Sequence, residues 1–262
     1  MRGIAHTRFD PTLGMSYKMT SKLTWYARYA QGFRGGGLAV AAGAGRTATY
    51  EPDTILVAET GMRADGLFGG LVSGMIGISR AWWRDVQADL VGRNGFPYTA
   101  NIGDGRVNAL ETQLVVRPTA RLRLEANGLF ATTKLIHPTP CFERDGGNAL
   151  PDTPKASVYA TLSWAPPIDA TQRLRLAFIV RRQGGSRLGA GALFGFDQQG
   201  YTEADVVASF TAGRRAYALR IDNLADAKGD RFALGNPFEL RDRNQYTPLR
   251  PRTIKLSVSQ AF

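Results

Sequence analysis

The chain has 262 residues, of which 44% are hydrophobic, and its formal net charge is +11. No apolar run approaches the roughly 20 residues that a membrane-spanning helix needs, which excludes a helical membrane protein. The single cysteine, Cys141, excludes an internal disulfide framework and a cysteine zinc cluster. Arginine carries most of the charge, but no helix-turn-helix, finger or basic-helix pattern accompanies it, so we expect no nucleic-acid partner.

Segments that alternate apolar and polar residues recur along the whole chain. In the last segment, Ile254, Leu256 and Val258 alternate with Lys255 and Ser257. A strand places such alternate side chains on opposite faces of a sheet. Bounded by Gly, Pro, Asn and Asp, segments of this kind predict eleven strands, near residues 12–20, 23–33, 54–64, 70–84, 106–117, 121–132, 156–165, 172–182, 202–212, 216–223 and 252–262.

The segment 70–84 fits the alternation least well. Arg80 falls on the same face as Ile76 and Ile78, so we expect a β-bulge there. Six aromatic residues near strand ends suit the interfacial girdles of a membrane barrel, namely Trp25, Tyr29, Trp82, Trp83, Trp164 and Phe262.

The connections between these strands alternate in length. Residues 20–22, 65–69, 118–120, 166–171 and 213–215 are short, whereas 35–53, 90–105, 133–155, 183–201 and 224–251 are long. Transmembrane barrels have short periplasmic turns and long external loops, and a soluble sandwich has no reason to sort loops in this way. The sequence therefore predicts an all-β fold, an antiparallel transmembrane β-barrel of about eleven strands.

The strand count and the N-terminus suggest that this barrel is incomplete. A single-chain barrel has an even number of strands, but eleven strands ending in the periplasm place the first entry point outside. Residues 1–11 also lack the apolar stretch of a signal peptide. We therefore expect the C-terminal part of a larger barrel, either a fragment or a gene whose start is placed too late.

Several motifs resemble the C-terminal barrel of TonB-dependent outer-membrane receptors. They are the Tyr-Ala-x-x-x-x-Gly-Phe-Arg run ending at Arg34, Tyr50-Glu-Pro-Asp-Thr54 with Glu59-Thr-Gly-Met-Arg63, Arg84-Asp-Val-Gln87, Gly105-Arg-Val-Asn-Ala-Leu-Glu111, Leu150-Pro-Asp-Thr-Pro154 and Ile221-Asp-Asn-Leu-Ala-Asp226. Each motif alone is weak, but their order and spacing over nearly the whole chain are specific. Arg63 replaces a lysine of the family pattern, and Ala109 replaces a glycine.

The resemblance implies a fold and a function for the parent protein. Residues 1–262 would form the C-terminal half of a 22-stranded barrel that lacks its plug domain. The parent would sit in the outer membrane of a Gram-negative bacterium and take up a scarce ligand, foremost a ferric siderophore. It would have no enzymatic activity and no intrinsic cofactor, the iron–siderophore being its ligand. Its partners would be the barrel-assembly machinery, outer-membrane lipid, the chelate, and the TonB complex through the missing plug.

Candidate ligand contacts are arginines and aromatic residues in the loops and lumen, because such side chains bind catecholate and carboxylate chelates. The candidates are Arg34, His137, Arg231, Arg241, Arg243 and Tyr246, and the terminal Phe262 is the expected barrel-assembly signal. The lumen is expected to be lined by Arg28, Glu59, Arg63, Glu111, Gln113, Arg117, Arg121, Arg123, Glu125, Arg173, Arg175, Arg181 and Arg220. This lining could attract an anionic ligand, dock an acidic plug face, or be ordinary solvated ion pairs.

Other functions stay open. A passive porin or an adhesin-like barrel would need an even strand number and a signal peptide. A soluble β-rich binding domain would be a detergent-independent monomer. His137 could act as an axial haem ligand, but the run Phe33-Arg-Gly-Gly36 departs from the Phe-Arg-Ala-Pro of haem receptors. No catalytic constellation or metal-ligand cluster is evident, so we expect neither a catalytic nor a metal site.

Overall fold

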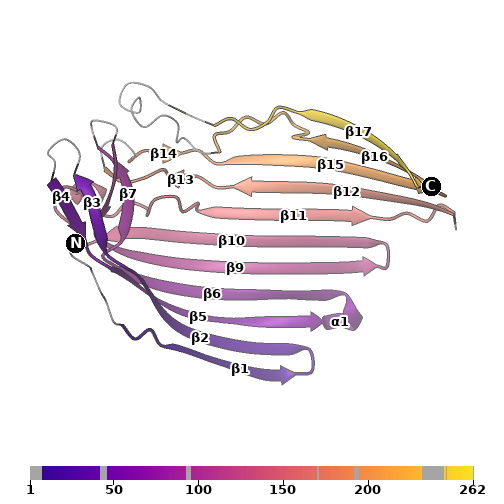
Figure 1. Ribbon diagram of the computed structural model, residues 1–262. Helices are drawn as coiled ribbons and strands as arrows, with labels where there is room; N and C mark the ends of the chain where they lie inside the picture. Colours follow the sequence, from indigo (N-terminus) through magenta and orange to yellow (C-terminus); the bar gives the residue numbers. More distant parts are fainter. Residues whose placement is uncertain are drawn as a thin grey trace.

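The computed structural model describes residues 8–41, 46–92, 96–169, 171–191, 195–231, 245 and 247–261. Its body is one antiparallel sheet of eleven strands, each paired with its neighbour along the chain once the loop hairpins are set aside (Figure 1). The strands in order are β1 (Thr12–Thr20), β2 (Leu23–Arg34), β5 (Asp53–Gly66), β6 (Val72–Arg84), β9 (Asp104–Thr119), β10 (Leu122–Ile136), β11 (Ala156–Trp164), β12 (Gln172–Gln183), β15 (Tyr201–Ala212), β16 (Arg215–Asp222) and β17 (Thr253–Gln260). All eleven predicted strands are confirmed.

Short elements fill the connections. The long loops carry three two-stranded hairpins, β3 (Gly37–Ala41) with β4 (Arg46–Tyr50), β7 (Gln87–Val91) with β8 (Pro97–Asn101), and β13 (Ser186–Arg187) with β14 (Asp197–Gln198). A 3₁₀ turn, η1, spans Glu143–Asp145, and a single turn, α1 (Leu67–Gly70), joins β5 to β6. The β3–β4 and β7–β8 hairpins lie together at one end of the sheet, which we call the long-loop end, opposite the short turns (Figure 1).

The register of the strands separates two faces. We call one the polar face, because Arg28 pairs with Glu59, Gln113 with Asn127, and Arg220 with Lys255. The other is the apolar face, which carries Met15, Ile78, Phe130, Phe178 and Leu256 among other large side chains. The expected lumen residues fall on the polar face, apart from Arg121, which lies in the turn before β10.

The apolar face is exposed along the whole sheet. Leu13 is 69% exposed in β1, Ile78 is 59% exposed in β6 and Leu256 is 76% exposed in β17. Soluble monomers rarely expose a contiguous apolar surface of more than a few hundred Å². An apolar band outside and polar side chains inside are what the wall of a membrane barrel requires.

The expected β-bulge in the segment 70–84 is wrong. The register of β6 runs without a shift against both β5 and β9. Arg80 stays on the apolar face, and its guanidinium lies over the ring of Trp82 at 5.3 Å from the ring centre. The stacked cation is thereby accommodated without a change in the backbone.

Trp83 was expected in an aromatic girdle, and this expectation is also wrong. Trp82 lies on the apolar face, so the next residue points to the polar face. There Trp83 packs against buried residues of the loops and hydrogen-bonds to Asp53. Trp25, Tyr29, Trp82 and Trp164 lie on the apolar face, and Phe262 is outside the described residues.

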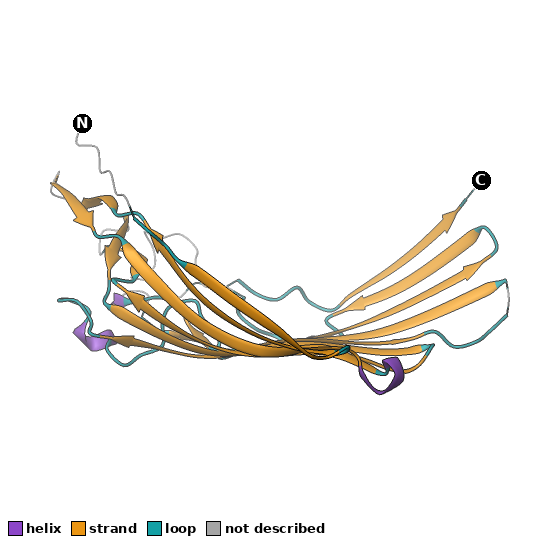
Figure 2. Cartoon of the chain, turned by 90° about the horizontal axis from the view of Figure 1, so that it is seen from below, coloured by secondary structure: helices purple, strands orange, loops and turns teal. Residues whose placement is uncertain are grey.

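The eleven-stranded sheet is a single curved layer with two free edges (Figure 2). β1 and β17 form these edges and do not pair with each other. Among the described residues, no helix has the length and apolar character to cross a membrane.

Candidate functional site

A small hydrophobic core lies at the long-loop end of the polar face. It is formed by buried side chains from four segments, Val86, Leu90, Ile102, Leu135, Phe142, Leu150 and Ala190, and we call it the loop core. Trp83 and Val107, from the polar face of the sheet, pack against it. Burial of these apolar groups fixes the long loops over the sheet.

Close packing at Gly105 shows how tightly the loops sit. A Cβ atom at this position would lie 3.0 Å from Leu150 Cδ1 and 3.1 Å from Val86 Cγ2. A glycine here lets two loops reach the backbone of β9. The glycine of the motif 105–111 therefore serves packing.

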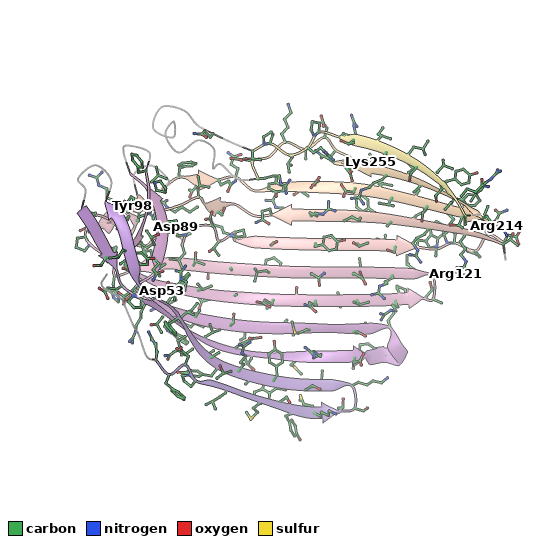
Figure 3. All side chains as sticks on the ribbon, viewed as in Figure 1. Asp53, Asp89, Tyr98, Arg121, Arg214 and Lys255 are labelled. Atoms are coloured by element: carbon green, nitrogen blue, oxygen red, sulfur yellow. The ribbon has the colours of Figure 1, made fainter. Side chains whose placement is uncertain are left out.

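Asp53, the first residue of β5, joins three segments at this end. Its carboxylate accepts hydrogen bonds from Arg34 Nε at 3.0 Å, Trp83 Nε1 at 2.9 Å and the backbone N–H of Gln87 at 3.3 Å. Asp53 is only 2% exposed. Each hydrogen bond helps to stabilise its carboxylate, whose negative charge would otherwise be costly to bury. Figure 3 places Asp53, Asp89 and Tyr98 at the long-loop end, far from Arg121 and Arg214 at the other.

Further bonds hold the β7–β8 hairpin in place. Gln87 Nε2 donates to the carbonyls of Gly35 and Glu51, both at 3.0 Å. Asn101 Nδ2 also donates to the carbonyl of Glu51, at 3.0 Å, and to that of Asp85, at 2.6 Å. The motifs 50–54 and 84–87 thus meet in space and act as positioning elements for the loops.

The loop after β10 is tied to the loop after β12 by an ion pair. Arg187 Nη2 donates to Asp145 Oδ1 at 2.9 Å, and the backbone N–H of Gly191 donates to Asp145 Oδ2 at 3.0 Å. Asp145 is 6% exposed. The pair fixes both loops beside the loop core.

A cavity of about 370 Å³ opens between these loops and the sheet. Its described lining is Trp83, Val86, Gln87, Ala88, Asp89, Leu150, Pro151, Asp152, Leu188 and Gly189. The walls are mostly apolar, with an amide and two carboxylates as polar groups. We call it the loop-end cavity. A mostly apolar pocket with a few polar groups is the usual form of a small-molecule site.

Tyr98 borders the loop core from β8. Burial raises the pKa of the Tyr98 phenol above its ordinary value of 10.0, and the nearby Cys141 raises it further. The phenol is therefore neutral over the physiological pH range.

A second buried carboxylate, Asp205 in β15, lies on the polar face. It is fully buried and accepts bonds from Arg181 Nη1 at 2.6 Å, Arg220 Nη2 at 3.3 Å and the backbone N–H of Asn223 at 3.0 Å. Asn223 has a φ of 50° and closes the following loop by donating to the carbonyls of Ala227 and Arg250. The motif 221–226 is thus the start of a loop closed by hydrogen bonds.

The structure does not bring together the three candidate ligand contacts that it describes. Arg34 lies on the polar face, where its guanidinium donates to Asp53 and stacks 5.3 Å from the ring centre of Trp83. His137 is 81% exposed and contacts Asp104, and it lines a depression with Trp82 and residues of the apolar face. Arg231 is exposed in the connection between β16 and β17, where its backbone N–H donates to the carbonyl of Thr247. Arg241, Arg243 and Tyr246 lie outside the described residues.

The loop-end cavity was missed by sequence reasoning. Its polar side chains come from two loops, Gln87 and Asp89 from β7 and Asp152 from the loop before β11, and their proximity depends on the fold. A signal did exist, because the cavity is bordered by the motifs 84–87 and 150–154. Within the described ranges, no group of three or more His, Cys, Asp or Glu side chains is arranged to hold a metal ion.

An open antiparallel wall with an apolar face, long loops at one end and a cavity beneath them has the architecture of part of an outer-membrane β-barrel. The chain belongs to the TonB-dependent receptor-like beta-barrel family, whose model matches residues 3–224. Members of this family are outer-membrane transport receptors of Gram-negative bacteria. No curated protein sequence matches the chain.

Solved structures confirm the fold. The ferric yersiniabactin uptake receptor FyuA from Yersinia pestis has a TM-score of 0.77 and 17% identity, covering 94% of this chain and 36% of its own. BauA, the ferric preacinetobactin receptor from Acinetobacter baumannii, has a TM-score of 0.69 and 18% identity, and the match covers 95% of this chain and 36% of BauA. The copper transporter OprC has a TM-score of 0.69 and 15% identity, and the match covers 96% of this chain and 39% of OprC. The chain spans little more than a third of each.

Proposed function

We propose that this chain forms part of the wall of an outer-membrane receptor that takes up a metal chelate, foremost a ferric siderophore, with energy from TonB. Family membership supports the transport role. The ligand class is supported by similar structures that are receptors for ferric siderophores. The energised step, the plug and the TonB contact are proposals about the whole protein.

The observation that carries the proposal is the loop-end cavity. It lies on the polar face beneath the long loops, where a ligand arriving from outside first meets the barrel. Trp83 offers an aromatic face, and Gln87 and Asp89 offer hydrogen-bonding groups. Arg34 stacks on Trp83 of this lining, and its side chain is 53% exposed, so part of its guanidinium is accessible to a chelate. His137 lies apart from this cavity, and we place it in a secondary role at the outer rim.

Copper remains the second candidate cargo, because a copper transporter has the same wall. No other observation favours it, and the described residues form no metal-binding cluster of their own. A chelate carrying its metal needs no such cluster, which is why an iron chelate is preferred.

The test is uptake of radioactive iron by cells that express the protein from its complete natural gene and lack their own iron receptors. Iron would be supplied as catecholate, hydroxamate and phenolate chelates in turn. Uptake of one class that stops when the proton-motive force is collapsed would support the proposal. Uptake that continues unchanged would indicate a passive pore, and transport of copper alone would replace the ligand class.

A further inference from the structure

The apolar face carries a group of cations at its long-loop end. Arg106 and Lys134 are direct cross-strand partners on β9 and β10, and Arg80 pairs with Asn108 one step further into the sheet. The full group, which we call the cation band, is Arg80, Arg84, Arg106, Lys134 and Arg182. At the opposite end of this face, the described strands hold one cation, Arg215.

The cation band has no anionic partner within the described chain. None of its members forms an ion pair, and Nε of Arg106 is buried without a hydrogen-bond partner. On the polar face at the same end, by contrast, Arg34, Arg181 and Arg220 each contact a carboxylate. Like charges directly opposite each other destabilise a sheet. The arrangement of Arg106 and Lys134 therefore calls for an external anion.

The carboxylates of the sheet are distributed in the opposite way. Among the described strand residues, Asp104 is the one acidic residue on the apolar face, at the first position of β9. Its carboxylate is 3.2 Å from Nδ1 of His137 and contacts no member of the cation band. The apolar face thus carries a positive charge at its long-loop end that the carboxylates of the described strands hardly compensate.

A groove continues from the cation band toward the middle of the sheet. Its volume is about 650 Å³, and its far part is largely apolar, with Ile78, Leu110 and Phe130 in one cross-strand row beside Thr60. Its near part is polar, with Arg80, Asn108 and Thr132 in one cross-strand row beside Ala58. The groove therefore changes from cationic to apolar along the strand direction. An amphiphile with an acidic headgroup and an apolar chain has the matching arrangement.

We propose that the cation band and this groove bind a phosphorylated lipid of the outer leaflet. Its phosphates would accept hydrogen bonds from Arg106, Lys134 and Arg182, and one acyl chain would lie in the groove over Ile78 and Phe130. Phosphate oxygens form strong charge-assisted bonds with guanidinium groups, and long cationic side chains reach headgroups from an apolar surface. The inference rests on the proposed placement in the outer membrane but not on the transported ligand.

The test compares two lipids and two matched double variants. The protein from its complete gene is purified in neutral detergent and titrated with diphosphoryl lipid A and with the same lipid after removal of its phosphates. Arg106→Gln with Lys134→Gln removes two charges of the cation band. Arg173→Gln with Arg175→Gln removes two charges of the polar face in β12 and serves as the control.

We expect the wild type to prefer the diphosphoryl lipid, the first variant to bind it about tenfold or more weakly, and the control to match the wild type. Equal binding of both lipids by the wild type would overturn the proposal, even if the first variant fails to fold. Equal loss in both variants, or displacement of the lipid by equimolar inorganic phosphate, would overturn it as well. Uptake of iron chelates should be the same in the wild type and in the variant of Arg106 and Lys134, so this result is separate from the transport proposal.

Discussion

The indole N–H of Trp83 donates to the carboxylate of Asp53 across 2.9 Å, and this bond joins the start of β5 to the end of β6 where the loops begin. The same carboxylate is bound by Arg34 and by the backbone of Gln87. The long-loop end is therefore organised around one buried charge on the polar face. Removal of this charge should lower the local stability of the loops more than that of the sheet.

Asp53→Ala should loosen the β7–β8 hairpin. The substitution leaves the N–H groups of Trp83 and Gln87 without an acceptor, and we expect a local loss of about 2 kcal/mol, reduced because Arg34 is half exposed. Hydrogen exchange of residues 87–101 in detergent would measure it. Glu51→Gln, an exposed change in the same loop, is the control, and equal protection in both variants would contradict the assignment.

Gly77→Ala should strain the polar face near its middle. A Cβ atom there would lie 2.6 Å from the hydroxyl of Tyr26, which bonds to Glu59 at 2.9 Å. We expect a loss of about 1–3 kcal/mol in denaturant unfolding in micelles. Gly14→Ala is the matched control, because no atom lies within 4 Å of its added Cβ. If both variants unfold at the same denaturant concentration, the side chain of Tyr26 can move aside and does not restrict the residue at position 77.

Asn223→Ala should open the loop that precedes β17. The change removes three side-chain hydrogen bonds to Ala227 and Arg250 and places alanine at a φ of 50°. Asn223→Gly removes the same bonds without the backbone strain, so the alanine variant should be the less stable by about 1 kcal/mol. Limited trypsin digestion would follow the opening. Resistance of both variants equal to that of the wild type would show that the loop is held elsewhere.

Tyr98 should make the loop core sensitive to alkali. Its pKa is raised by burial above 10.0, so the stabilisation is full below that pH and is lost as the pH rises through the raised value. Thermal unfolding of wild type and Tyr98→Phe should therefore converge from about pH 9 to about pH 12, with the wild type falling faster. Parallel curves at all pH values would mean that the phenol ionises freely in the folded state.

The 262-residue chain by itself should require detergent. Its apolar face exposes Leu13, Ile78 and Leu256, and the outer edges of β1 and β17 have no partner strand in the described sheet. We expect precipitation in plain buffer and dispersion in micelles, measured by sedimentation. A monomer with protected amides in plain buffer would contradict the membrane reading of the apolar face.

The sheet could be predicted from sequence because the membrane environment imposes a local rule on every strand. Lipid on one side and water on the other force the alternation seen in Leu174, Leu176 and Phe178 against Arg173 and Arg175. By the same rule, adjacent strand residues lie on opposite faces, so only one of Trp82 and Trp83 could belong to the aromatic girdle. The bulge at Arg80 was predicted from charge alone, without its stacking on Trp82.

The loops could not be predicted in this way. The β7–β8 hairpin contributes Leu90 to the loop core, which also holds Leu135 and Leu150, and Gln87 donates to the carbonyls of Gly35 and Glu51. These contacts join segments that are distant in the chain, and no local pattern marks them. The loop-end cavity is a product of the same contacts, so motif matches gave its borders but not its shape.

The loop core reverses the usual division between strands and loops. In the described residues, the strands of the wall bury few side chains on their own, whereas the loops contain the main buried apolar cluster. The wall needs a hydrocarbon solvent to complete it, but the loops are stabilised by water exclusion as in a small soluble domain. In the proposed receptor, the long-loop end would therefore keep its shape as the surrounding lipid changes, and a ligand would meet a preformed surface.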